Sequence, residues 1–171
     1  MKNKIFVTDY HSPCGNLCLG SYGNSLCLCD WSAERDRETI VKRLIRMLDA
    51  EIIEGKTPVT IAAVNQLDEY FAGKRLNFDI PLIVCGTEFQ CRVWDELQRL
   101  NYGQRITYRE LAERIGNKKA SRAVAGACNA NALSIFIPCH RIVGSSGSMT
   151  GYAGGLLAKS YLLELEKSFK S

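Results

Sequence analysis

The residues best suited to chemistry in this sequence stand together between positions 135 and 143. An apolar run there delivers Pro138, Cys139 and His140, and a second apolar run follows. A thiolate is a strong nucleophile, and a nearby imidazole can help to generate it. The chain has only 2 histidines, so a histidine base is either His140 or His11.

The adjacency of thiol and imidazole sets a geometric condition. Neighbouring residues on an extended chain point to opposite sides, so a link between Cys139 and His140 requires a sharp turn or a bridging water. A cysteine beside a histidine also occurs in ordinary buried packing, so the pair alone does not distinguish a catalytic site from a packed core.

Five of the 14 glycines fall between Gly144 and Gly155, just after this pair. Since no Gly-Lys-Ser/Thr follows, they favour a loop over the cysteine rather than a phosphate-binding loop.

The first half of the chain predicts strands followed by helices. Three short apolar segments separated by Gly or Asn turns are typical of an antiparallel meander: residues 4–9, 16–21 and 25–31. Apolar side chains then recur at helical spacing from position 40 to 48. Thr57 as N-cap, Pro58 at the first helical position and Gly73 just past the end delimit a second helix. Residues 77–86 indicate a connection, which gives an N-terminal structural domain at 1–80 and a C-terminal domain at 86–171.

The second half is predicted to be mostly helical. One helix carries the apolar stripe Phe89, Val93, Leu97 and Leu100, with Trp94 beside it. A capping box, Thr107-x-x-Glu110, opens a second helix, which breaks at Gly116. A third helix runs from about Lys119 to Cys128, and the tight turn between the two is typical of a helix-turn-helix. The third helix has small side chains, which either approach a flat partner closely or pack tightly against another helix.

Charge and composition narrow the class of protein. Hydrophobic residues make up 46% and charged residues 23%, which excludes a disordered chain. No apolar run approaches the ~20 residues of a membrane span, and none resembles a secretory signal, so we expect a cytoplasmic protein. The net charge is +4, and a stretch of basic residues lies in the second half: Arg105, Arg109, Arg114, Lys118, Lys119, Arg122 and Arg141. Such a stretch suits a polyanionic partner, or is a solvated surface.

The 8 cysteines are expected to be reduced thiols rather than disulfides. Cys18, Cys27 and Cys29 sit in strand-like runs, where a free cysteine behaves as a small buried hydrophobe. A zinc site is the alternative, because Cys14 completes a C-x3-C and C-x-C set with them. That spacing is unlike the usual C-x2-C, and His11 is the only histidine nearby.

Together, these segments resemble the O6-alkylguanine-DNA alkyltransferases, also called methylated-DNA–protein-cysteine methyltransferases. The family's signature, Pro-Cys-His-Arg and two aliphatic residues, stands at 138–143, after an Asn-rich lead-in at 129–131. A Gly-Tyr-x-Gly-Gly loop follows at 151–155. Further matches are Ser12-Pro13-x-Gly15, Thr87, Phe89, Val93, Trp94, Leu97, Tyr108, residues 121–124, and the Lys-x-x-Leu-Leu-x-x-Glu tail at 159–166. The resemblance spans nearly the whole chain and is continuous from 86 to 166.

The resemblance implies a fold and a reaction. The fold is α+β, with a small N-terminal antiparallel sheet and helices of ribonuclease H-like type, then a mostly helical domain with a helix-turn-helix. The reaction is direct-reversal DNA repair, in which an alkyl group on O6 of guanine, or on O4 of thymine, passes once and irreversibly to Cys139. No cofactor and no metal are implied. The zinc ligands of vertebrate members are not matched.

The resemblance also assigns roles to single residues in the reaction. Cys139 is the acceptor, His140 resembles the water-linked base, and Glu166 resembles the carboxylate that orients it. Asn131 resembles the residue that braces the active-site turn. Tyr108 resembles the hydroxyl donor that offsets charge on the departing guanine.

The implied partner is double-stranded DNA, bound through the minor groove with the damaged base flipped out. Arg122 resembles the arginine that enters the base stack, and Tyr108, Lys118 and Lys119 are further DNA-binding candidates. Five residues are expected to line the substrate pocket: Cys128, Ile142, Tyr152, Ala153 and Lys159. We expect a monomer that does not bind membranes.

The sequence departs from the family pattern at two positions. Ala132 and Ser134 stand where members have proline, and a less rigid turn there is expected to alter the width of the pocket.

Two alternative functions stay open at this point. One is a noncatalytic helix-turn-helix protein that binds lesions, and the other is a cysteine hydrolase using Cys139 and His140. Transfer of a labelled methyl group to the protein separates the first from repair, because a binder gains no label. A hydrolase would turn over many times.

Overall fold

A four-stranded sheet forms the centre of the first of two units, Met1–Cys85 and Gly86–Ser171. The computed structural model describes residues 2–32, 37–147 and 151–169. The elements of the first unit, in chain order, are β1 (Asn3–Ser12), β2 (Gly15–Tyr22), β3 (Ser25–Trp31), α1 (Arg37–Leu48), β4 (Ala50–Glu54) and α2 (Pro58–Phe71). The strand order is β3-β2-β1-β4.

The sheet confirms the predicted meander and adds one strand to it. β1, β2 and β3 pair antiparallel, whereas β4 pairs with β1 in parallel. The observed sheet is therefore mixed. The prediction of a wholly antiparallel sheet without β4 was wrong on this point. The sequence Ala-Glu-Ile-Ile-Glu is too short, and too close to the end of α1, to stand out as a strand. The α+β class of the prediction is confirmed.

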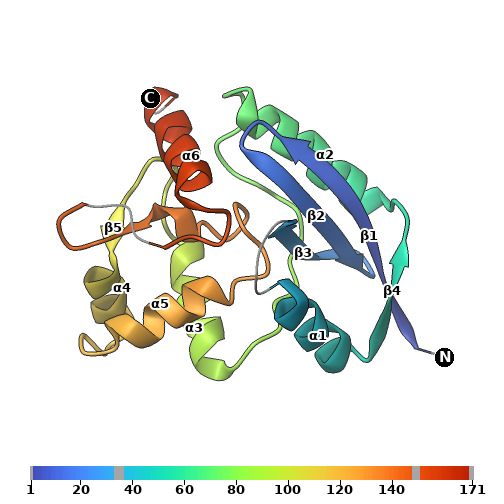
Figure 1. Ribbon diagram of the computed structural model, residues 1–171, viewed down its shortest axis with the longest axis horizontal. Helices are drawn as coiled ribbons and strands as arrows, with labels where there is room; N and C mark the ends of the chain where they lie inside the picture. Colours follow the sequence, from blue (N-terminus) through green and yellow to red (C-terminus); the bar gives the residue numbers. More distant parts are fainter. Residues whose placement is uncertain (1, 33–36, 148–150, 170–171) are drawn as a thin grey trace. The chain divides into compact units, whose positions relative to one another are not determined.

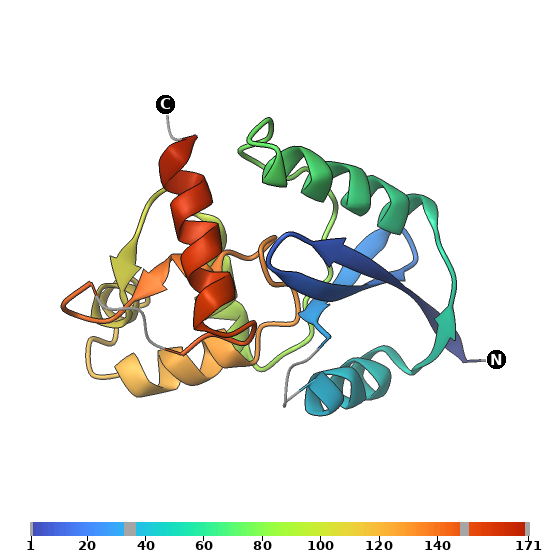
Figure 2. The same ribbon diagram turned by 45° about the horizontal axis from the view of Figure 1, so that its top comes forward.

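The two helices of this unit lie on opposite sides of the sheet (Figures 1 and 2). The start of α2 follows the sequence closely: Thr57 is the N-cap, its side chain accepts from the backbone nitrogen of Thr60, and Pro58 opens the helix. Gly73 follows the end of α2 with a φ of 75°, a conformation that glycine adopts without strain. Cys18, Cys27 and Cys29 are buried, as expected of thiols in a core.

The second unit is built mainly of helices. Its elements are α3 (Glu88–Gln98), β5 (Ile106–Thr107), α4 (Tyr108–Arg114), α5 (Ser121–Asn129), the 3-10 helix η1 (Cys139–Arg141), β6 (Ile142–Val143) and α6 (Leu156–Ser168). α4 and α5 form the predicted helix-turn-helix, and Gly116 turns the chain between them with a φ of 87°. The capping box of Thr107 and Glu110 is present at the start of α4.

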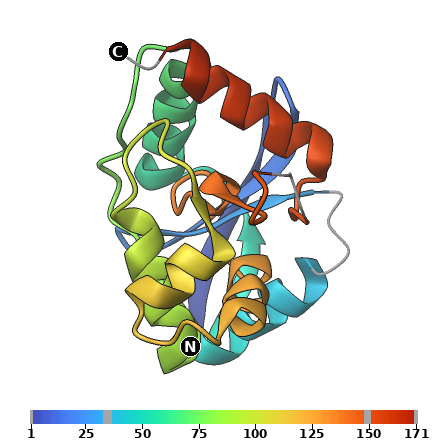
Figure 3. The ribbon, with the colours of Figure 1, turned by 90° about the vertical axis from the view of Figure 1, so that its left-hand side faces the viewer.

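One segment of this unit differs from its sequence pattern. The apolar run before Cys139 was predicted to be a strand, but it forms a tight turn closed by an isolated bridge between Ser134 and Ile137. Every residue from 131 to 143 is buried. This segment passes between α6 and the group formed by α3, α4 and α5 (Figures 1 and 3). Its apolar composition therefore reflects burial on all sides rather than strand pairing.

Some features of the fold bear on partners and metals. Across the residues that the structure describes, no helix is long and apolar enough to cross a membrane. The same residues contain no group of three or more His, Cys, Asp or Glu side chains arranged to hold a metal ion. The cysteines of the alternative zinc set, from Cys14 to Cys29, are all free thiols.

Replacing glycine by alanine should have opposite effects on stability at two positions of the second unit. A Cβ at Gly126, on the exposed side of α5, would meet nothing within 4 Å, whereas a Cβ at Gly86 would lie 2.5 Å from the ring of the buried Trp94. Gly126→Ala should raise the free energy of unfolding by about 0.5–1 kcal/mol, because alanine loses less backbone entropy in a helix. Gly86→Ala should lower it by about 1–3 kcal/mol through overpacking. Urea unfolding of both variants checks the pair, and equal signs would contradict the packing described.

Candidate active site

Cys139 lies at the start of η1, inside the buried turn, and is 5% exposed. The side-chain amide nitrogen of Asn131 is 3.3 Å from Cys139 Sγ and 2.9 Å from the carbonyl oxygen of Ile137. The amide oxygen of Asn131 accepts from the backbone nitrogen of Leu133 at 2.9 Å. An amide nitrogen carries two hydrogens, so Asn131 can donate to both acceptors at once. Asn131 therefore fixes the turn and contacts the thiol.

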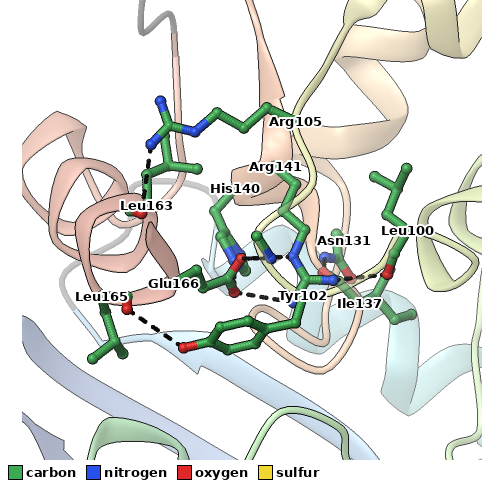
Figure 4. A network of polar contacts seen from close by, with 11 residues as sticks. Leu100, Tyr102, Arg105, Asn131, Ile137, His140, Arg141, Leu163, Leu165 and Glu166 are labelled. Carbon is green, nitrogen blue, oxygen red and sulfur yellow. Dashed lines mark hydrogen bonds and ion pairs between the residues drawn. The ribbon is translucent and has the colours of Figure 1, made fainter. Parts of the chain in front are cut away.

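Glu166, on α6, is the charged centre of the site and is 1% exposed. Its Oε2 lies 2.7 Å from His140 Nε2, and its two oxygens accept from Arg141 Nε and Nη2 at 2.9 and 3.0 Å. The backbone nitrogen of Gly103 donates to Oε1 at 3.2 Å. Arg141 also donates to the carbonyl oxygen of Leu100 at 2.9 Å. Figure 4 shows the His140 and Arg141 side chains converging on this carboxylate.

These contacts set the charge states of the site. Burial alone raises the pKa of the Glu166 carboxyl, but His140 and the Arg141 guanidinium outweigh burial and hold it well below its ordinary value. Burial lowers the pKa of His140 despite the attraction of Glu166, so the ring is neutral at neutral pH. Because a carboxylate can only accept, Nε2 carries the ring proton and Nδ1 carries the lone pair. His140 Nδ1 is buried and has no hydrogen-bond partner among the described residues.

The 3-10 helix η1 supplies the sharp turn that the adjacent Cys139 and His140 were expected to need. In a 3-10 helix, neighbouring side chains point about 120° apart, because there are about three residues per turn. Cys139 can therefore face Asn131 while His140 faces Glu166. The thiol and the imidazole contact different parts of the chain, the segment just after α5 and α6, although they are adjacent in the sequence.

A buried lysine lies next to this arrangement. Lys159, on α6, is fully buried, and its Nζ donates to the carbonyl oxygen of Ile142 at 2.5 Å. Nζ lies 6.0 Å from the centre of the Tyr108 ring. Burial lowers the pKa of Lys159, whereas the nearby thiols of Cys139 and Cys128 favour its charged form. Burial likewise raises the pKa of Cys128, which keeps that thiol protonated. The structure thus brings Cys128, Tyr108 and Ile142 close to the lysine.

The loop before α6 is described in part. Tyr152 and Ala153 are half-buried, and the carbonyl of Tyr152 accepts from Gly155 at 2.9 Å, which turns the chain into α6. Residues 148–150 of the predicted glycine-rich loop lie outside the described residues.

The basic stretch separates into surface residues and one buried arginine. Arg109 pairs with Glu113, and Arg114 pairs with Glu96. Within this stretch, the exposed residues that form no ion pair with another described residue are Arg105, Lys118, Lys119 and Arg122. Arg141 is 6% exposed, so its assignment to the basic surface was wrong. Its guanidinium forms an ion pair with the Glu166 carboxylate instead.

Comparison with known proteins identifies the family. A family model described as 6-O-methylguanine DNA methyltransferase, ribonuclease-like domain, matches residues 5–84, and its counterpart for the DNA binding domain matches residues 88–168. A methylated-DNA–protein-cysteine methyltransferase of Mycobacterium bovis is 50% identical over 170 residues, which cover 96% of this chain and 93% of that protein. This chain belongs to the 6-O-methylguanine DNA methyltransferase family. The resemblance seen in the sequence is confirmed.

Solved structures of the family agree over almost the whole chain. The crystal structure of Mycobacterium tuberculosis O6-methylguanine methyltransferase has a TM-score of 0.81 and 37% identity, covering 98% of this chain and 95% of that one. The crystal structure of Mycobacterium tuberculosis OGT in complex with DNA has a TM-score of 0.80 and 38% identity, with coverages of 97% and 94%. The methyltransferase fold of this chain is thus shared along its length.

Sequence reasoning missed Arg141 and Gly103 as partners of Glu166. The signal for Arg141 was present, because it stands inside a run of apolar residues that must be buried. A buried arginine requires a carboxylate partner, and Glu166 was already a candidate. Nothing in the sequence pointed to the backbone nitrogen of Gly103.

The buried neutral ring of His140 predicts a pH dependence of stability. The unfolded chain binds a proton at this histidine near its ordinary pKa of ~6.5, whereas the folded chain does not, because burial lowers the folded pKa. The free energy of unfolding should therefore fall as pH drops below about 6.5, by up to ~1.4 kcal/mol per pH unit, until the folded pKa is reached. Urea unfolding between about pH 5 and pH 7.5 measures this slope.

His140→Gln should lose the slope, because its amide can still donate to Glu166 but does not titrate. His11→Gln, at the exposed histidine, is the matched control and should keep the slope. An unchanged slope in His140→Gln would show that folding does not lower the pKa of this ring, which would contradict the neutral buried state.

Proposed function

We propose that this chain repairs DNA by direct reversal, moving an alkyl group from O6 of guanine to Cys139 Sγ. The observation that supports this most directly is the pairing of the buried thiol with the amide of Asn131, beside a neutral imidazole held by Glu166. Each part of that arrangement favours formation of a thiolate at one position. The names of the relatives, which include methylated-DNA–protein-cysteine methyltransferases, describe the same chemistry.

The proposed mechanism begins with removal of the thiol proton. Glu166 accepts from His140 Nε2, which leaves the lone pair of Nδ1 to take the proton of Cys139 through a bridging water. The Asn131 amide donates to the resulting thiolate, and the ammonium of Lys159 adds a favourable charge nearby. Arg141 balances the charge of Glu166, so the imidazole is oriented without being protonated in advance.

The transfer itself is a single displacement. The thiolate attacks the alkyl carbon, a C–S bond forms, and the bond between that carbon and O6 breaks with its electron pair going to guanine. The Tyr108 hydroxyl is proposed to donate to the departing base, since it lies beside Lys159 at the site. The product is a thioether, so one protein repairs one lesion. The reaction needs no cofactor.

DNA binding is assigned to α4 and α5. The exposed face of α5 combines Arg122 with the small residues Ala123 and Gly126, which allows a close approach to a groove. Lys118 and Lys119 precede it and are proposed to contact phosphates. The complex of Mycobacterium tuberculosis OGT with DNA supports a DNA partner. We propose that the target is double-stranded DNA, entered from the minor groove, with Arg122 replacing the flipped nucleotide in the base stack.

The proposal extends to the pocket and the setting of the reaction. The flipped base is proposed to lie against five residues: Cys128, Ile142, Tyr152, Ala153 and Lys159. We expect a monomer acting in the cytoplasm, where the free state of the 8 cysteines is favoured. A noncatalytic lesion-binding role is less well supported, because binding alone does not require a hydrogen-bond donor at the thiol, as Asn131 provides.

The acceptor is tested with Cys139→Ser. Its hydroxyl is similar in size but a far weaker nucleophile, so transfer of a labelled methyl group from a methylated oligonucleotide should be abolished while binding to the lesion persists. Intact mass and peptide mapping measure the adduct. Cys91→Ser, at a half-buried thiol on α3, is the matched control and should be methylated like the wild type. Mapping of the methyl group to any cysteine other than Cys139 would refute the proposal.

The role of Arg122 is tested by comparing duplex DNA with a free base. If Arg122 fills the space of the flipped nucleotide, Arg122→Ala loses the offset to an unstacking cost of a few kcal/mol. Repair in duplex DNA should slow roughly tenfold to a thousandfold, while the reaction with free O6-benzylguanine stays nearly unchanged. Single-turnover rates on the two substrates measure the difference.

Lys119→Ala provides the control for general attraction to DNA. It should weaken duplex binding and make the slope of log affinity against log salt shallower by about one, without affecting the free base. Equal defects of Arg122→Ala on both substrates would instead mean that Arg122 supports the fold or the pocket.

A further inference from the structure

Ile135 has a backbone conformation that its residue type disfavours. Its φ is 74°, and among the described residues only Asp49 shares a positive φ outside glycine. A branched Cβ collides with the neighbouring carbonyl in this left-handed region, so the conformation persists only where the surroundings impose it. Ile135 lies four residues before Cys139 in the chain, inside the turn that carries the thiol.

Ile135 is buried in a turn that backbone hydrogen bonds close. The side chain is 1% exposed, within a segment that is buried from 131 to 143. The backbone nitrogen of Ile137 donates to the carbonyl of Leu133 at 2.8 Å, which closes a loop of chain around Ile135. The nitrogen of Cys139 then donates to the carbonyl of Ile137 at 2.8 Å. These two bonds connect the conformation of Ile135 to the position of Cys139.

We propose that Ile135 is a positioning residue for alkyl transfer. Its left-handed backbone brings the carbonyl of Ile137 and the thiol of Cys139 to the same amide group, that of Asn131, at 2.9 and 3.3 Å. A hydrogen bond donated to the thiolate favours the charged form of Cys139. The proposal rests on the function proposed above and adds that backbone strain at one isoleucine maintains the donor to the reacting sulfur.

A purely structural role for Ile135 makes a different prediction. If the side chain only fills the core, glycine and alanine at this position should both be unstable, with glycine worse, as at any ordinary position. If the left-handed backbone is what matters, glycine should be better than alanine, because only glycine adopts that φ without strain. The two variants lose nearly the same buried side chain, so their difference isolates the backbone.

The first measurement is urea unfolding of Ile135→Gly and Ile135→Ala, in sucrose if either is too unstable in buffer. We expect the unfolding equilibrium constant of Ile135→Ala to exceed that of Ile135→Gly by about tenfold. Ile137 is the matched control, because it is equally buried in the same turn and its φ is not positive. Ile137→Gly should be less stable than Ile137→Ala. The same order at both positions would overturn the proposal.

The second measurement is the rate of alkyl transfer from free O6-benzylguanine as a function of pH. Ile135→Gly should keep the apparent thiol pKa of the wild type. Ile135→Ala should shift it upward by about one unit, which is a tenfold loss of rate on the acidic side of the profile. Coincident profiles for the two folded variants would overturn the proposal, because a core-filling role does not move a thiol pKa.

Other outcomes are also decisive. A wild type that gains no label on Cys139 refutes the proposed function itself, whereas an active wild type with coincident variant profiles refutes only the role of Ile135. If only one variant folds, Ile135→Gly as the survivor supports the proposal and Ile135→Ala overturns it. If neither folds, the distance between the amide and α protons of Ile135 is measured by NMR in the wild type. A short distance, as left-handed φ requires, supports the proposal, and a long one overturns it.

Discussion

Removing the Glu166 carboxylate from water carries a free-energy cost that only paired charges and hydrogen bonds can offset. The offset comes from three places in the C-terminal unit: the ring of His140, the guanidinium of Arg141 and the backbone of Gly103. These groups belong to η1 and to the segment before β5, while Glu166 belongs to α6. Satisfying one buried charge therefore requires three separate parts of the chain to meet, and the acceptor thiol is carried on one of them.

A second constraint links the DNA-facing helix to the thiol. Asn131 lies two residues beyond the end of α5, and its side chain donates to both Ile137 and Cys139. Under the proposed function, this residue links the end of the helix that approaches DNA to the sulfur that accepts the alkyl group. The thiol is thus contacted from the end of α5 through Asn131, while the imidazole of His140, its proposed base, is contacted from α6 through Glu166. Chemistry depends on both helices keeping their places on the buried turn.

The sequence predicted those features whose causes are local. The caps at Thr57 and Thr107 and the turn at Gly116 depend on a few neighbouring residues, and the structure contains them. The features that failed depend on distant partners. The strand β4 exists because β1 offers it a free edge, and Arg141 is buried because Glu166 is within reach. The run before Cys139 looked like a strand because burial on all sides selects the same apolar residues as a central strand does.

The single use of the site follows from what the alkylated sulfur leaves around it. Cys139 is 5% exposed, and the turn around it is closed by hydrogen bonds on both sides of Ile137. Once an alkyl group is bound to the sulfur, the amide of Asn131 faces a neutral thioether instead of a thiolate, so this contact no longer favours a charged sulfur. Regeneration would require a second nucleophile to approach the alkyl carbon in line with the C–S bond. Arg141 and Lys159 are buried, and their side chains already donate to the Glu166 carboxylate and to the carbonyl oxygen of Ile142. The donor and the base that favour one thiolate therefore do nothing to activate the C–S bond of the product, and each protein accepts one alkyl group.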